Sequence, residues 1–153
     1  MEMTAVALAV LGASCAVGLS SLGAGFGIAY SGAAMSGAVA ERPEAFTKSL
    51  IAVVLAEALA IYGLLISFMI IMKLPDLAAI TVAEEAASAA YGAFAAGLAV
   101  GLAALGAGFG IAYSGAAMSG AVAERPEAFT KSLIAVVLAE ALAIYGLLIS
   151  FMI

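Results

Sequence analysis

The sequence predicts an all-α membrane protein with four transmembrane helices, arranged as two tandem helical hairpins. Of the 153 residues, 67% are hydrophobic and only 10% are charged, whereas a soluble domain averages about 45–50% apolar and 25% charged residues. The stretch Leu22–Ile70 recurs without a change at Leu105–Ile153, so the chain is a tandem duplication. Each copy holds two apolar runs that exceed the roughly 20 residues a helix needs to cross a bilayer.

The apolar runs set the expected boundaries. We expect a first hairpin at 1–73 with spans at about 4–39 and 46–72, a linker at 74–85, and a second hairpin at 86–153 with spans at about 86–122 and 129–153. The first span of each hairpin is long, about 36 residues or roughly 54 Å, and should tilt or project from the membrane. A short polar loop, AERPEAF, joins the two spans of each hairpin.

Basic residues predict the orientation of the chain. Arg42, Lys48, Arg125 and Lys131 flank the two short loops, and only Lys73 lies at the opposite end. Cytoplasmic loops carry an excess of Lys and Arg. We therefore expect both loops in the cytoplasm and both termini outside, in a prokaryotic cell membrane. Two hairpins of the same orientation disfavour inverted-repeat transporters, whose halves face opposite ways.

Composition also argues against other classes of function. The formal net charge is −5 and no segment is basic enough to suggest nucleic-acid binding. The stretch GAGFG does not have the spacing of a dinucleotide-binding loop, and no strand precedes it. We expect no metal site, no cofactor and no catalytic centre in this chain.

Glycine is dense on the first helix of each hairpin. The positions are Gly18, Gly23, Gly25, Gly27, Gly32 and Gly37, with Gly101, Gly106, Gly108, Gly110, Gly115 and Gly120 in the second copy. Small residues let membrane helices approach closely. Because they cover nearly all sides of the helix, they predict a helix crowded by several neighbours, as in the inner wall of a closed ring.

Each copy of VVLAEALAIYG contains one acid, Glu57 or Glu140. Glu57 lies about 13 residues beyond Glu44, roughly 20 Å along a helix, which places it near mid-membrane. No Lys, Arg or His lies deep inside any span, and an unpaired carboxylate in hydrocarbon takes up a proton rather than staying charged. An ionisable residue inside a membrane is a functional hypothesis by default. We interpret both acids as ion carriers; the alternative is a protonated carboxyl that serves as a structural hydrogen-bond donor.

Four tyrosines are candidates to support these acids. Tyr62 and Tyr145 follow the acids by five residues, and Tyr30 and Tyr113 lie on the glycine-rich helices. Each hydroxyl can hydrogen-bond a carboxyl group, and packing is the alternative role. Spacing alone does not rank them.

Together these features resemble the proteolipid ring subunit of rotary ATPases. A glycine-rich first helix, a short ERPE loop and VVLAEALAIYG with one mid-membrane acid carry the resemblance, which covers nearly the whole chain. The RPE loop and AIYGLLIS look closer to the V-type and archaeal-type branch than to the F-type branch. The doubled hairpin also looks like the V-type proteolipid.

The resemblance implies a fold, partners and a mechanism. Copies of the chain would form a homo-oligomeric ring in the lipid bilayer, with the glycine helices inside and the Glu-bearing helices outside. Glu57 and Glu140 match the family's ion-carrying carboxylate, which exchanges ions with a stator protein that holds an essential arginine. Ring rotation would be coupled to ATP turnover in a soluble head. The loops that would contact the central stalk contain Arg42, Pro43, Glu44, Arg125, Pro126 and Glu127.

The coupling ion is expected to be the proton. Sodium-binding members of the family surround the carboxylate with Gln and with Ser or Thr oxygens, whereas this chain has no Gln, and Ala58 or Ala141 follows each acid. Sodium is the alternative ion, with backbone carbonyls and Tyr30 or Tyr113 as remaining ligands. One departure from the family is that both acids are present, whereas eukaryotic double-hairpin members typically lack one.

Two hypotheses of another class stay open. A pore or small transporter built of hairpins would need a polar face along one helix, and only the isolated acid is found. A structural scaffold would not need a matched acid in each copy. A large closed oligomer would favour the ring over a small transporter.

Overall fold

The four expected spans are helices in the computed structural model of the chain, which describes residues 2–153. They are α1 (Glu2–Glu41), α2 (Phe46–Ala79), α3 (Ala83–Glu124) and α4 (Phe129–Met152). Each is long and apolar enough to cross a membrane. The predicted class, an all-α membrane protein of four transmembrane helices, is therefore confirmed.

The loop of each hairpin is a tight bend centred on a proline. Arg42 is extended, with φ −141° and ψ 95°, and Arg125 has nearly the same angles. Extended backbone is expected there because the proline ring disfavours a helical residue before it. A single 3-10 turn follows each arginine, at Pro43–Ala45 and Pro126–Ala128, and the next helix starts at once.

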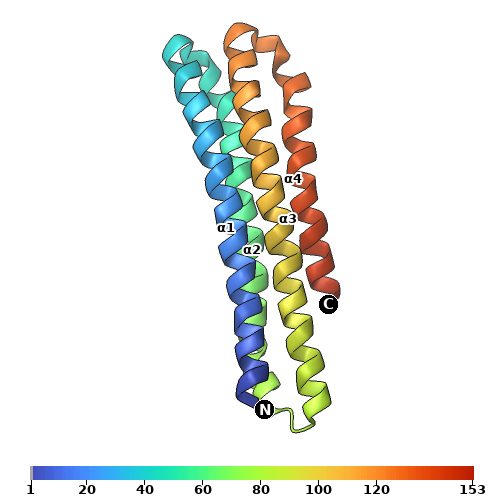
Figure 1. The fold of residues 1–153 in the computed structure, drawn as a ribbon. Coiled ribbons are helices and arrows are strands. Elements are labelled where there is room, and N and C mark those ends of the chain that lie inside the picture. The colour runs from blue at the N-terminus through green and yellow to red at the C-terminus, as the bar shows by residue number, and fades with distance from the viewer. Residues whose placement is uncertain (1) are drawn as a thin grey trace.

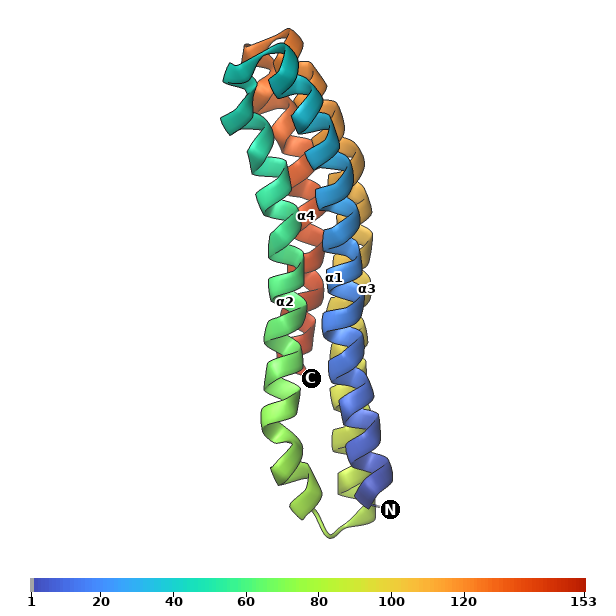
Figure 2. The same ribbon diagram turned by 90° about the vertical axis from the view of Figure 1, so that its left-hand side faces the viewer.

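The helices form two layers. α1 and α3 lie side by side in one layer, and α2 and α4 form the other (Figures 1 and 2). Both loops lie at the same end of the bundle, so the hairpins run in the same direction (Figure 1). The common direction follows because each hairpin contains two α-helices, so the second hairpin starts at the same end of the bundle as the first.

Glycine allows α1 and α3 to touch through their backbones. A Cβ built on Gly97 would collide with the carbonyl oxygen of Gly12, and one built on Gly108 would collide with that of Gly23. The two contacts are 11 residues apart on each helix, about three turns, so they lie on one face. Gly23 and Gly108 belong to the predicted set of packing glycines, whereas Gly12 and Gly97 lie upstream of the exact repeat.

The connection between the hairpins is shorter than the linker expected at 74–85. α2 continues through Pro75 to Ala79, and α3 begins at Ala83. Charge and proline near Lys73 made the helix appear to end there. It continues because Leu77 is buried and Leu74 and Ile80 pack against the same apolar cluster.

Candidate functional site

The two acids have equivalent positions in their hairpins because the residue before each one packs against a glycine. A Cβ built on Gly27 of α1 would lie 2.7 Å from the Cβ of Ala56, and one built on Gly110 of α3 would lie 2.7 Å from that of Ala139. These contacts fix the rotation of α2 and α4. Successive residues of a helix are about 100° apart, so Glu57 and Glu140 each point toward a flank of their hairpin rather than toward the glycine helix.

Glu140 receives a hydrogen bond from the other hairpin. The Tyr62 hydroxyl on α2 donates to Glu140 Oε1 on α4 at 2.6 Å, and both side chains are partly buried. A length of this kind is typical of a hydroxyl that donates to a carboxylate. The site at Glu140 is thus formed where the two hairpins meet, and one chain supplies both of its members.

Glu57 has the equivalent position at the opposite edge of the chain. Glu57 is exposed. Tyr145, the repeat counterpart of Tyr62, is 61% exposed and lies at the other edge of the chain. The repeat therefore contains a second Tyr and Glu pair whose members lie on the two outer flanks. A single chain cannot bring Tyr145 to its own Glu57, since both hairpins lie between them.

The other two tyrosines lie in a different part of the bundle. Tyr30 of α1 and Tyr113 of α3 face each other with ring centroids 6.1 Å apart. One turn away, Phe26 and Phe109 stack at 4.7 Å. Aromatic pairs at such distances stabilise packing, so Tyr30 and Tyr113 pack against each other from α1 and α3, although both side chains are exposed.

The loop residues lie at the end of the bundle away from both termini. Arg42, Pro43 and Glu44 are exposed, as are Arg125 and Glu127, while Pro126 is partly covered. Pro126 is covered because Lys48 of α2 donates a hydrogen bond from Nζ to its carbonyl oxygen at 2.9 Å.

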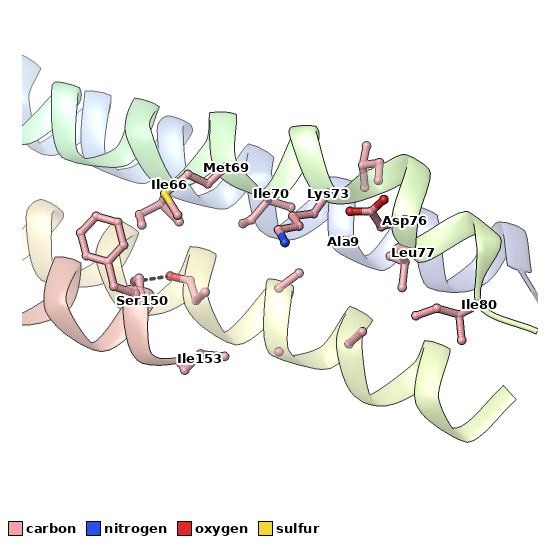
Figure 3. Close-up of a pocket in the computed structure, with 16 residues that line it drawn as sticks. Ala9, Ile66, Met69, Ile70, Lys73, Asp76, Leu77, Ile80, Ser150 and Ile153 are labelled. Atoms are coloured by element: carbon pink, nitrogen blue, oxygen red, sulfur yellow. Dashed lines mark hydrogen bonds between the residues drawn. The ribbon is translucent and has the colours of Figure 1, made fainter. Parts of the chain in front are cut away.

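A large pocket lies at the opposite end and is separate from both acids. It has a volume of about 390 Å³ and a mostly apolar lining, with Lys73 and Asp76 at its edge (Figure 3). Its lining residues come mainly from α2 and α3. Neither Glu57 nor Glu140 lines it, so the carrier candidates are side chains on helix flanks and not residues of this pocket.

Sequence reasoning missed two features of this arrangement. The pairing of Tyr62 with Glu140 joins residues 78 positions apart, and helical spacing cannot show which neighbouring helix a side chain meets. The contact of Gly12 with Gly97 lies outside the identical segment. The 11-residue spacing to Gly23 and Gly108 is the signal that would have found it.

Comparison with known proteins supplies a family. A family model that describes the C subunit of ATP synthase matches the chain twice, at residues 11–70 and 94–153. The c''2 subunit of the V-type proton ATPase of Arabidopsis thaliana is 35% identical over 140 residues, 91% of this chain and 79% of that protein. The 16 kDa proteolipid of the V-type proton ATPase of Homo sapiens is 37% identical over 142 residues, 93% of this chain and 87% of that protein.

An archaeal protein is similar over a comparable length. The K subunit of the A-type ATP synthase of Methanocaldococcus jannaschii is 38% identical over 145 residues, which make up 95% of this chain and 60% of that protein. These relatives belong to two eukaryotes and an archaeon, so the expected prokaryotic membrane stays a prediction.

Proposed function

Since the chain belongs to the family of ATP synthase C subunits, we propose that it is the ion-translocating rotor subunit of a V-type or A-type rotary ATPase or ATP synthase. In this role it is an integral membrane proteolipid without a catalytic centre, and ATP is turned over elsewhere in the complex. The observation that carries the proposal is the hydrogen bond from Tyr62 to Glu140 together with the exposed Tyr145 and Glu57 on opposite flanks.

The contact between the two hairpins supports a ring. It joins one flank of the first hairpin to the opposite flank of the second, so it is a heterologous contact. Contacts of this kind form rings when the rotation closes. Because the two hairpins are nearly identical in sequence, the free flank of the second hairpin fits the free flank of the first hairpin in another copy.

The glycines support the same repetition. Six of them have nothing within 4 Å of an added Cβ, and four of these six are repeat counterparts of a crowded glycine. These four are Gly18, Gly25, Gly32 and Gly106, and their crowded counterparts are Gly101, Gly108, Gly115 and Gly23. A second copy docked in the same way would crowd all four. Gly37 and Gly120 are counterparts of one another, and both are open.

Glu57 and Glu140 carry the ion in this proposal. Tyr62 holds Glu140 within the chain, and Tyr145 of the adjoining copy would hold Glu57. Each carboxyl is neutral while it faces lipid, because a bare charge in hydrocarbon is costly. It releases its ion when it reaches the stator, where an arginine of the stator protein favours the carboxylate.

The proton is the proposed ion. The oxygen atom that binds Glu140 is a phenol hydroxyl, which suits a carboxyl that gains and loses a proton. A sodium ion needs several oxygen ligands in place of its water, and the chain has no Gln and has Ala58 or Ala141 after each acid. In the proposed orientation both loops face the cytoplasm and contact the central stalk.

Carbodiimide labelling of the purified assembly tests this function. Carbodiimides modify protonated carboxyl groups in apolar surroundings, and peptide mass spectrometry identifies the modified residue. We expect labelling at Glu57 and Glu140 that fades as the pH rises and that sodium does not prevent. Protection by sodium would replace the proton with sodium and keep the rotor. The absence of labelling at both acids would reject the carrier role.

A further inference from the structure

A lysine joins the two hairpins at the loop end of the bundle. Besides its hydrogen bond to the Pro126 carbonyl, Lys48 Nζ lies 6.0 Å from the ring centroid of Phe129. The ammonium group thus meets a carbonyl in the 3-10 turn between α3 and α4 and the face of an aromatic ring. Both contacts favour a cation.

The same three residues exist a second time, divided between the two flanks. The counterparts of Lys48, Pro126 and Phe129 are Lys131, Pro43 and Phe46. Lys131 and Pro43 are exposed, and Phe46 is 47% exposed. The Pro43 carbonyl accepts the Phe46 N–H, and its second lone pair is open to another donor.

Toward the end of the bundle opposite the loops, the residues that face each other within the chain differ from their repeat counterparts. Inside the chain, Gly97 lies so close to Gly12 that a Cβ on Gly97 would collide with the Gly12 carbonyl. The counterparts of these two glycines are Ser14 and Ala95, and both are exposed. Since Ser14 has a Cβ, α3 of one copy cannot approach α1 of the next as closely at this level as α1 and α3 approach within the chain.

We propose that the contact between two copies of this chain, called the seam here, is tight at the loop end and splayed at the opposite end, where the helices are further apart. The inference rests on the proposed ring. At the loop end Lys131 of one copy bonds to the Pro43 carbonyl of the next copy and lies against its Phe46. At the level of Ser14 and Ala95 the helices are roughly 1 Å or more further apart than at Gly12 and Gly97, because non-bonded heavy atoms need about 3.5 Å. The ring therefore contains two kinds of contact between neighbouring hairpins in alternation, one within a chain and one between copies.

The loop-end contact is tested by comparing Lys131→Met with Lys48→Met in the full chain. Losing a charged hydrogen bond between copies should speed dissociation of the detergent-solubilised ring into single chains by roughly tenfold or more. Lys48→Met should leave this rate near that of the unmodified chain, since the Lys48 contact lies within one covalent chain. Equal rates for both variants would overturn the Lys131 contact.

Photo-cross-linking tests the same contact between copies if the Lys131→Met variant does not assemble. Benzoylphenylalanine at position 46 should give adducts between chains on irradiation, and at position 129 only adducts within a chain. Adducts between chains from position 129 and not from position 46 would overturn the docking direction.

The splayed end is tested by electron cryomicroscopy of the ring. The spacing of the inner helices at the level of Ser14 and Ala95 should alternate between narrow and wide gaps. The variant Ser14→Gly with Ala95→Gly should reduce this alternation. Equal gaps in the unmodified ring would reject the splayed seam but leave the proposed ring in place. If the chain formed no large assembly, the proposed function itself would be rejected.

Discussion

The Tyr62 hydroxyl of the first hairpin donates a 2.6 Å hydrogen bond to Glu140 of the second hairpin. The two residues are far apart in sequence and lie in the layer formed by α2 and α4. Their repeat counterparts, Tyr145 and Glu57, lie exposed on the two outer flanks of the described chain, although the surrounding sequence is identical. The difference is one of position, because only the facing flanks of the two hairpins are in contact.

The first prediction concerns the specificity of the two tyrosines. Tyr62→Phe removes the donor to Glu140, so Glu140 should react with carbodiimide roughly tenfold faster, the effect of losing a hydrogen bond to an ionisable group. Labelling of Glu57 should stay unchanged. Peptide mass spectrometry of the labelled assembly measures both sites at once.

The matched control is Tyr145→Phe. In the ring this variant should raise labelling of Glu57 and leave Glu140 unaffected. If Tyr62→Phe altered both acids equally, the tyrosines would act through general packing and not through the hydrogen bond.

The second prediction concerns the proposed need for both acids. In the proposed rotor every acid passes the stator, so one neutral amide per chain should stop rotation. Glu57→Gln and Glu140→Gln should each abolish ATP-driven ion uptake by vesicles that contain the whole complex. Glu85→Gln, in the first turn of α3 at the end of the bundle opposite the loops, should retain uptake. Uptake by either amide variant at the level of this control would show that its acid is dispensable.

Much of the fold could be predicted from the sequence because the signals are local. Long apolar runs give the four helices, and the repeated ERPE loops give two hairpins in one direction. The end of α2 could not be predicted so well. Pro75 and the charges beside it suggest a break, and only the packing of Leu77 against the rest of the bundle outweighs that signal.

The site could be predicted only in part. An acid in an apolar run stands out by its cost in hydrocarbon, so the sequence around Glu57 and Glu140 makes both of them candidates. Choosing Tyr62 over Tyr30 as a partner required the placement of α2 beside α4. That placement depends on Gly27 and Gly110, which set the rotation of α2 and α4 through Ala56 and Ala139.

The third prediction concerns orientation. With Cys15 replaced by Ala, a single cysteine at Glu41 should react with a membrane-impermeant maleimide only from the cytoplasmic side. A cysteine at Thr81, exposed in the short connection between α2 and α3, should react only from the other side. The excess of Lys and Arg around the loops is the physical reason. The reverse pattern would place the loops outside and exclude contact with a cytoplasmic stalk.

The last prediction separates packing within the chain from packing between copies. Gly23→Ala forces a Cβ into the backbone of Ala104 and Leu105. Such overpacking should destabilise the single chain by about 1–3 kcal/mol. Its repeat counterpart Gly106 is open, so Gly106→Ala should leave the thermal unfolding of the dispersed chain unchanged and weaken the ring. Gly120→Ala should affect neither measurement, because Gly120 and its repeat counterpart Gly37 are both open. A ring that tolerates Gly106→Ala as well as Gly120→Ala would contradict a contact between copies that repeats, at the level of Gly106, the contact within the chain.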